Sequence, residues 1–263
     1  MNKHLASFPY YTFANLDRFG EIRHFVTSCC QGELTNVNLR SPLGAQNRQR
    51  LAQSVGFVID RLVTGEQTHS LNIAVVTEKE AGLGNLDIDS RIPCTDALIT
   101  NVKGICIMVL TADCVPVLLY DCKTHSVAAI HSGWKGTLNR ISQKTVFYMQ
   151  SLYGTRPEDL RAVIGPGICR HCFQVGDEVV GYFKDNGIDI HPIYSWDGPK
   201  AENMKGGHHL DLIEENRLLL IESGVPAANI HVAGVCTYED GRFFSARREG
   251  AACGRIINAI KLL

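Results

Sequence analysis

The sequence predicts an α+β fold, built as a single domain over residues 1–263. Helical and strand-like segments alternate irregularly, and several strand-like runs follow one another too closely to leave room for a helical crossover. No internal repeat, low-complexity tract or Gly/Ser/Pro-rich linker divides the chain. At 263 residues and 29.0 kDa, the chain is near the upper size that one hydrophobic core organises.

The N-terminal half begins with a predicted helix and continues with strands. Residues 46–57 show helical spacing of apolar side chains and close at Gly56, a residue that commonly ends helices. The short β-branched runs 58–63 and 71–77 predict strands. Residues 97–129 contain three apolar runs separated only by short polar segments, which predicts neighbouring buried strands at the centre of the fold.

The C-terminal half carries further helices and strands. Apolar spacing and closing glycines predict helices over residues 137–153, 178–186 and 210–223. The other expected elements are a strand from Arg161 that stops at Pro166, an extended segment at 188–194, a strand at 230–235, a hairpin turning at Asp240-Gly241, and a short C-terminal helix from Gly254.

Charge and hydropathy exclude several classes of function. The chain has 26 basic and 27 acidic side chains, a net charge of -1, which argues against a nucleic-acid partner. A hydrophobic content of 45% argues against disorder. No apolar run is long enough to span a membrane, and charges and proline interrupt the first thirty residues, unlike a signal peptide. We therefore expect a cytoplasmic protein with no membrane partner.

Ten cysteines and ten histidines are the unusual part of the composition. Disulfides are the weaker explanation, because cysteine-rich secreted scaffolds are short whereas this chain can build an ordinary core. Cys106 and Cys122 lie in apolar runs and are predicted to be buried thiols. Cys169 and Cys172 form a Cys-x-x-Cys pair that we interpret as a turn lining the site, with half of a zinc site or redox exchange as the alternatives.

Three segments place a metal-competent side chain at the end of an apolar run: GEQTHS with His69, LTADCVP with Cys114, and AIHSGWKG with His131. Two imidazoles and a thiolate form the open kind of zinc site, which leaves a position for water or substrate. Separations of 45 and 17 residues resemble no zinc finger. On spacing alone, an exposed loop histidine, a buried thiol and a hydrogen-bonded core histidine remain the alternative.

Several motifs together resemble one known family: QTHS, TADCVPVLL, AIHSGWKGT, GPGIC followed by RHCFQVGDEV, DLIEENRLLL, and RFFSARREGAACGR. From about Phe25 to the C-terminus the chain resembles the YfiH-like, multicopper polyphenol oxidase (laccase) domain family of the purine nucleoside phosphorylase type. The resemblance implies mixed sheets flanked by helices, in a fold of the cysteine-hydrolase type. It also implies zinc held by His69, Cys114 and His131, with copper as the other candidate metal.

The activity that the resemblance implies is phosphorolysis of adenosine, inosine, guanosine and S-methyl-5'-thioadenosine, together with deamination of adenosine. The expected partners are purine nucleosides and phosphate, and a homodimer is compatible with this expectation. The sequence HSGWKG replaces the usual HAGWRG of the family, so Lys135 stands where an arginine is common. Lysine does not grip phosphate in the bidentate manner of arginine, which bears on phosphorolysis.

Phosphorolysis needs cations that fix phosphate against a cation-like ribose. We consider Arg48, Lys135, Arg247 and Arg248 for this role, each with the alternative of an ordinary surface cation. For deamination, the H-x-E and P-C-x-x-C signature of the zinc nucleobase deaminases is absent. Asp113 precedes Cys114 and is interpreted either as a carboxylate that orients a ligand histidine or as a solvated or backbone-capping carboxylate.

Other functions use the same residues. Cys114 as a nucleophile with His131 as its base would give a cysteine hydrolase acting on peptidoglycan precursor peptides. A copper polyphenol oxidase is less favoured, because four-copper centres need clustered imidazoles and the sequence has no His-X-His pair. A module in which the metal serves folding alone is a non-enzymatic alternative.

Overall fold

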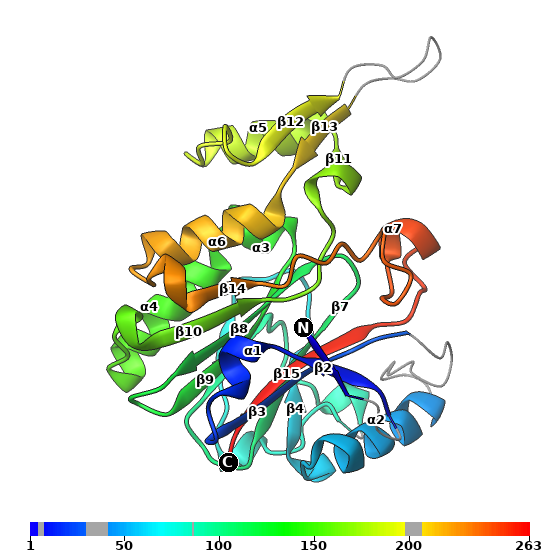
Figure 1. Cartoon of the computed structure of the whole chain (residues 1–263), viewed down its shortest axis with the longest axis vertical. Coiled ribbons are helices and arrows are strands. Elements are labelled where there is room, and N and C mark those ends of the chain that lie inside the picture. The colour runs from blue at the N-terminus through cyan, green and yellow to red at the C-terminus, as the bar shows by residue number, and fades with distance from the viewer. Residues whose placement is uncertain (5–7, 30–41, 86, 198–206) are drawn as a thin grey trace.

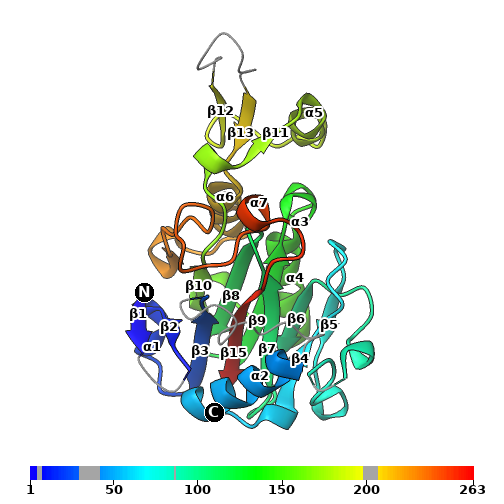
Figure 2. The ribbon, with the colours of Figure 1, turned by 90° about the vertical axis from the view of Figure 1, so that its right-hand side faces the viewer.

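The computed structural model describes residues 1–4, 8–29, 42–85, 87–197 and 207–263. Its main body is a stack of four layers (Figure 1, Figure 2): two mixed six-stranded sheets pack face to face, and helices cover their outer faces. The strand orders are β1-β2-β3-β15-β7-β4 and β14-β10-β8-β9-β6-β5. This is the mixed α+β fold that the sequence predicts.

Both sheets combine parallel and antiparallel pairs. In the first sheet β15 is antiparallel to β3 and β7, whereas β4 is parallel to β7. Its strands are β1 (Asn2–His4), β2 (Tyr10–Thr12), β3 (Ile22–Thr27), β4 (Leu62–Thr64), β7 (Cys106–Thr111) and β15 (Ile256–Leu262). The second sheet contains β5 (Ile73–Val75), β6 (Ala97–Thr100), β8 (Val115–Asp121), β9 (Ser126–Ser132), β10 (Leu160–Ile164) and β14 (Ile230–Val232).

The central strands β6 to β9 and β15 are buried on both faces because each side of each sheet meets another layer. Along β7, Ile107 and Val109 join the apolar cluster between the sheets, while Cys106 and Met108 point to the opposite face. That opposite face is covered by α2 (Pro42–Val55), whose Leu51 belongs to the same cluster as Cys106 and Met108. The period of two in strand side-chain direction therefore divides one continuous apolar run between two cores.

The outer face of the second sheet is covered by α4 (Ile141–Tyr153) and α6 (Leu212–Glu222), with α3 (Trp134–Leu138) beside them (Figure 1). A small sheet extends beyond the four layers, with α5 (Asp177–Asp185) beside it (Figure 2). Its order is β11 (Gln174–Val175), β13 (Gly207–Leu210) and β12 (Tyr194–Asp197). Among the described residues, the other α-helices are the single turns α1 (Ala14–Asp17) and α7 (Ala246–Glu249).

The connection from β7 to β8 positions the site. It consists of residues 112–114 and carries the chain from the first sheet into the second, so the apolar run expected as one strand is two. Asp113 adopts φ 85°, a left-handed conformation that costs a residue other than glycine about 1–2 kcal/mol. This tight turn places Cys114 where the two sheets meet.

Two helix predictions differ from the structure. The helix expected over 137–153 is broken into α3 and α4, because Arg140 has φ 62° and ends the first turn. The C-terminal helix predicted from Gly254 is wrong, since residues 256–262 form β15, buried at every position and paired with β3 and β7. Pairing on both edges overrides the local signal, and the isoleucines of this segment favour a strand.

Three strand predictions also need correction. Of residues 58–63, Ile59–Arg61 form a 3-10 turn and pairing begins at Leu62. Of residues 188–194, Tyr194 alone joins a strand. The hairpin at Asp240-Gly241 is wrong, because Asp240 accepts a bond from Arg242 N within a series of turns.

The shorter predictions agree better with the structure. The helix expected over 46–57 is confirmed as α2, and those at 178–186 and 210–223 as α5 and α6. Among the described helices, none has the length and apolar character needed to cross a bilayer.

Candidate metal centre

The three predicted metal ligands come together from three elements. His69 lies in the loop after β4, Cys114 in the turn between β7 and β8, and His131 in β9. Their ligand atoms lie within 4.8 Å of one another, and Cys114 Sγ is 3.8 Å from His69 Nε2. The imidazoles of His69 and His131 meet edge to face with ring centroids 5.0 Å apart. His131 is buried and His69 exposed, so one side of the group is open.

Asp96 holds two of these ligands in place. Its buried carboxylate accepts hydrogen bonds from the backbone N–H groups of Thr68 (3.2 Å), His69 (3.1 Å) and Ser70 (2.7 Å). These bonds account for the left-handed φ of 60° at His69, because the turn points successive N–H groups at one anion. Asp96 Oδ1 also lies 2.7 Å from His131 Nδ1, which leaves Nε2 as the nitrogen for a ligand.

Close packing fixes the remaining geometry. A Cβ on Gly133 would lie 2.8 Å from His69 Cδ2 and 3.1 Å from Cys114 Sγ, so this position needs glycine. The Gln67 amide donates to Leu110 O at 2.7 Å and accepts from Leu110 N at 2.8 Å. Both ends of that side chain therefore tie the loop of His69 to the end of β7.

The electrostatics favour the thiolate form of Cys114. Burial would raise the pKa of this thiol, but the charge of His131 and hydrogen bonds from both imidazoles lower it to about 6. Burial would lower the pKa of His131, but Cys114 and Asp96 raise it to about 9. Burial also opposes ionisation of Asp96, whose pKa nonetheless lies below its usual range because His131 and Ser70 hydrogen-bond to it. A metal ligand or a nucleophile requires the thiolate.

Asp113 anchors the backbone beside Cys114. Its Oδ1 accepts from Thr237 Oγ1 at 2.6 Å, its Oδ2 from Arg247 N at 2.7 Å, and its carbonyl from Ile168 N at 2.9 Å. The carboxylate is thus engaged by Thr237 and by the backbone of α7. The carboxylate at His131 is Asp96, so of the two interpretations of Asp113 the structure shows the backbone cap.

A cavity of about 330 Å³ opens on the three ligands. Two arginines line it: the Arg255 guanidinium donates to the carbonyls of Ala251 (2.9 Å) and Cys253 (2.6 Å), and Arg91 Nε donates to Ile88 O at 2.7 Å. The rest of the described lining consists of Gly65, Gln67, Leu110, Ala112, Ala246 and Ala251. The cavity therefore combines soft metal ligands with two fixed cations.

The four cations predicted for phosphate lie elsewhere. Arg48 is buried in α2, where its guanidinium donates to Asn85 O at 2.7 Å, and Lys135 is exposed with Nζ over the Trp134 ring. Neither residue lines the cavity. Arg48 is buried together with the apolar residues of its helix, and the presence of a positive charge in the sequence does not reveal this burial.

Arg247 and Arg248 lie nearer but are directed at backbone carbonyls. The Arg247 guanidinium donates to Cys172 O and Gln174 O, and that of Arg248 donates to Thr237 O and Tyr238 O at 2.7 Å. Neither lines the cavity. These two side chains brace turns next to the site.

Comparison with known proteins identifies the family. Residues 40–263 match the family described as multi-copper polyphenol oxidoreductase laccase. The chain belongs to this family. Among curated relatives, a purine nucleoside phosphorylase from Bacteroides thetaiotaomicron is 35% identical over 264 aligned residues, covering 95% of each chain. An adenosine deaminase named RL5, from an unknown prokaryotic organism, is 40% identical over 81% of this chain and 79% of its own.

The fold of the laccase-type chain agrees with solved relatives. The crystal structure of YlmD from Geobacillus stearothermophilus superposes with a TM-score of 0.88 at 29% identity, covering 99% of this chain and 98% of that one. The YfiH protein of Bacillus licheniformis gives a TM-score of 0.85 at 30% identity, covering 92% and 93%. The chain is an enzyme of this family, with the mixed α+β fold of these structures.

The family description names copper, and the donor set can be compared with that expectation. His69, Cys114 and His131 suit a metal ion because their ligand atoms converge and the thiol pKa is low. Within the described residues, the two groups of potential ligands are this one and a cysteine-rich cluster that contains no histidine. A four-copper centre with clustered imidazoles is not assembled from these two groups.

Sequence reasoning missed Asp96, Gln67, Gly133, Arg91 and Arg255. Asp96 opens the strand run DALITN, and a search for carboxylates at strand starts would have included it. Arg255 lies within the family motif RFFSARREGAACGR but was passed over for its neighbours. For Gln67 and Arg91 the sequence carries no signal beyond closeness to His69 and to a polar loop.

Proposed function

We propose that this chain is a zinc-dependent purine nucleoside phosphorylase that also deaminates adenosine, with adenosine, inosine, guanosine and S-methyl-5'-thioadenosine as substrates. One observation carries the proposal: a single cavity holds a Cys-His₂ donor set together with Arg91 and Arg255. The names of the curated relatives support the reaction class.

The donor set suits zinc at least as well as copper. One thiolate and two imidazoles with an exposed side match the open zinc sites of enzymes. When bound, zinc supplies Lewis-acid stabilisation of developing negative charge. Asp96 keeps the ring of His131 oriented, and the loop bonds to the same carboxylate keep His69 in register with it. The ligands are therefore positioned before any ion arrives.

Arg91 and Arg255 are proposed as the phosphate-binding cations, in place of Arg48, Lys135, Arg247 and Arg248. Both side chains line the cavity. The Arg255 guanidinium is held by backbone carbonyls, and that of Arg91 by Ile88 O and by Glu66 Oε1 at 3.8 Å, so little ordering is needed when an anion binds. Arginine binds phosphate through paired N–H groups, which suits a nucleophile that must be held against C1′ of the ribose. The cavity volume of about 330 Å³ is within the range of small-molecule sites.

The test is product analysis after incubation of zinc-loaded protein with adenosine, with and without phosphate. Adenine and ribose-1-phosphate that form only with phosphate support phosphorolysis, and inosine that forms without it supports deamination. Cys114→Ala should abolish both reactions, whereas Cys122→Ser should leave them unchanged because this thiol bonds to Asp159 O, away from the cavity. Absence of either product from the wild-type protein would refute the proposal.

The arginines can be tested separately from the metal ligands. Arg255→Ala should raise the KM for phosphate by about tenfold or more, the scale of one lost charged hydrogen bond, with little effect on the KM for nucleoside. Arg156→Ala is the matched control, since that arginine is exposed and pairs with Glu158. An unchanged phosphate KM in Arg255→Ala would remove this residue from the phosphate site.

A cysteine hydrolase is a second candidate, because the lowered pKa of Cys114 also suits a nucleophile with His131 as its base. His69 Nε2 lies 3.8 Å from the Cys114 sulfur, so the thiol has two imidazoles beside it. A nucleophile needs only one base, and the second imidazole therefore favours a metal. Release of an amine from a peptidoglycan precursor peptide by metal-free protein would favour the hydrolase. The cytoplasmic location and a homodimer stay predictions from the sequence.

A further inference from the structure

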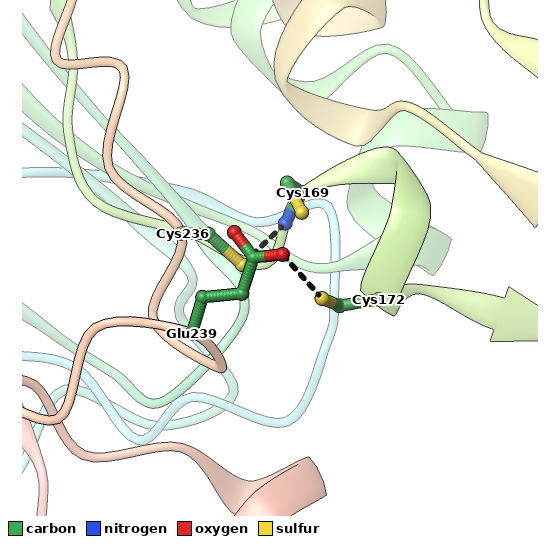
Figure 3. A group of neighbouring side chains, drawn as sticks. All are labelled: Cys169, Cys172, Cys236 and Glu239. Carbon is green, nitrogen blue, oxygen red and sulfur yellow. Dashed lines mark hydrogen bonds between the residues drawn. The ribbon is translucent and has the colours of Figure 1, made fainter.

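A second group of ligand-forming side chains lies outside the cavity. Cys169, Cys172, Cys236 and Glu239 place three sulfurs and a carboxylate oxygen within 4.8 Å of one another (Figure 3). Cys172 Sγ is 3.6 Å from Glu239 Oε1, and the backbone N–H of Cys169 donates to Cys236 Sγ at 3.3 Å. We call this group the cysteine cluster. None of its members lines the cavity.

Two backbone turns build the cysteine cluster. The 3-10 turn η6 (Arg170–Cys172) includes a bond from Cys172 N to Cys169 O at 3.1 Å, and a second turn includes a bond from Asp240 N to Cys236 O at 2.9 Å. Each turn contributes its first ligand and a second one three residues later. Such spacing directs both side chains of a turn to one side, and two such turns facing each other are how zinc ribbons hold their ion.

Backbone pairing joins the two turns. Gly167 N donates to Val235 O at 3.3 Å, and Thr237 N donates to Gly167 O at 3.0 Å. Arg247 donates to Cys172 O, and Arg248 donates to Thr237 O. These hydrogen bonds hold the two turns together without involving the four ligand atoms. The cations Arg247 and Arg248 also lie beside the cysteine cluster, which would be negative when ionised.

The ligand types of the cysteine cluster suit a divalent cation. Three sulfurs and one carboxylate oxygen converge within 4.8 Å, and in their deprotonated forms these are groups that bind a metal ion.

We propose that Cys169, Cys172, Cys236 and Glu239 form a closed zinc site, separate from the metal centre of the cavity. A tetrahedral ion with zinc–sulfur bonds of about 2.3 Å has its ligand atoms roughly 3.8 Å apart, so the observed group needs only a small contraction. Three thiolates favour zinc over magnesium or calcium, which prefer oxygen. Four protein ligands leave no place for substrate, so the site is structural.

The proposed zinc would fix the wall beside Cys114. The segments that carry the cysteine cluster meet at Asp113, which accepts bonds from Ile168 N and Thr237 Oγ1. Asp113 holds the strained turn that positions Cys114. Zinc at the cysteine cluster would therefore stabilise the turn that positions this ligand of the cavity, and it would do so whatever reaction the cavity performs.

The test uses full-length protein in which the cavity ligands are removed by His69→Ala and Cys114→Ala. Purified under reducing conditions and given zinc, this protein should retain one equivalent by elemental analysis after gel filtration. Adding Cys236→Ser should lower zinc affinity at least 100-fold, whereas the control Cys122→Ser should change nothing. No retained zinc in the starting protein, or full retention after Cys236→Ser, would overturn the proposal.

A cobalt probe covers the case in which Cys236→Ser fails to fold. In the same starting protein, bound Co²⁺ should show a strong thiolate-to-metal charge-transfer band, and Glu239→Gln should weaken binding while keeping that band. Absence of the band would overturn the site, as would a disulfide between two of the three cysteines in protein kept reduced and then alkylated. The readout is metal binding alone, so its failure is distinct from failure of the proposed enzyme activity.

Discussion

Asp96→Asn tests whether one buried carboxylate organises the metal centre. Asp96 is 1% exposed. Its carboxylate accepts hydrogen bonds from three consecutive backbone N–H groups and from Ser70 Oγ at 2.7 Å, and it is paired with the ring of His131. Asparagine has the same shape but a single acceptor oxygen and no charge. The substitution therefore removes electrostatics while leaving the volume nearly unchanged.

The magnitude follows from the bonds that asparagine cannot keep. With its oxygen at the Oδ2 position, it retains Thr68 N and both groups of Ser70, but its amide then faces the N–H of His69 and Nδ1 of His131. Two charge-assisted bonds are lost at about 1.5–3 kcal/mol each, so the free energy of unfolding should fall by about 3–6 kcal/mol. Loss of a carboxylate that hydrogen-bonds to a ligand histidine should also weaken metal binding about 10–100-fold.

The assay measures stability and zinc affinity on the same samples. Urea unfolding of metal-free protein gives the first quantity, and competition with a chromophoric chelator gives the second. Both are measured in a Cys236→Ser background, so that the cysteine cluster does not contribute. Asp121→Asn is the matched control: this carboxylate is also buried and caps Lys123 N and Thr124 N, away from the cavity.

Asp96→Asn and Asp121→Asn should differ in zinc affinity. Asp121→Asn should lower the free energy of unfolding while zinc affinity stays within about twofold of the parent. Asp96→Asn should lower both. If Asp96→Asn binds zinc as tightly as the parent, the carboxylate does not position the metal ligands.

Two further predictions concern packing and pH. Gly133→Ala should weaken zinc binding about tenfold in chelator competition, since the added methyl would lie 2.8 Å from His69 Cδ2 and overpacking costs about 1–3 kcal/mol. In the control Gly181→Ala the methyl meets nothing within 4 Å, so zinc affinity should stay unchanged. Equal zinc affinities of the two variants would contradict the clash at Gly133. Burial and then the charge of Glu222 raise the pKa of Glu215 to about 7, so its contribution is complete below pH 4.5 and is lost as pH rises through 7. Relative to Glu215→Gln, the wild-type free energy of unfolding should therefore fall by up to about 3 kcal/mol between pH 4.5 and 8 in urea titrations, and parallel pH profiles would contradict this sign.

The sequence predicts the three metal ligands because each of them follows a local pattern. His69, Cys114 and His131 each end an apolar run beside small or polar residues, and strand ends near one edge of a fold tend to meet. The structure does bring their ligand atoms within 4.8 Å. The apolar runs of residues 97–129 likewise predict the buried strands at the centre of the molecule.

The remainder depends on pairings that no local pattern contains. Asp96 meets His131 because β6 and β9 pair with Ala97 opposite Ile130, and this register is set by tertiary packing. Arg255 reaches the cavity from the start of β15, a segment whose short apolar run suits a helix as well as a strand. Cys236 and Glu239 join Cys169 and Cys172 across more than sixty residues of chain, so a Cys-x-x-Cys pair alone indicates only half of the cluster.

We propose that the cavity at His69, Cys114 and His131 performs phosphate-dependent cleavage of purine nucleosides. The most direct measurement is the initial rate of ribose-1-phosphate formation from adenosine by zinc-loaded protein as phosphate is increased. We expect a rate that saturates with phosphate in the wild type and that is absent in Cys114→Ala. Ribose-1-phosphate formation that persists in Cys114→Ala, or none at any phosphate concentration in the wild type, would contradict it.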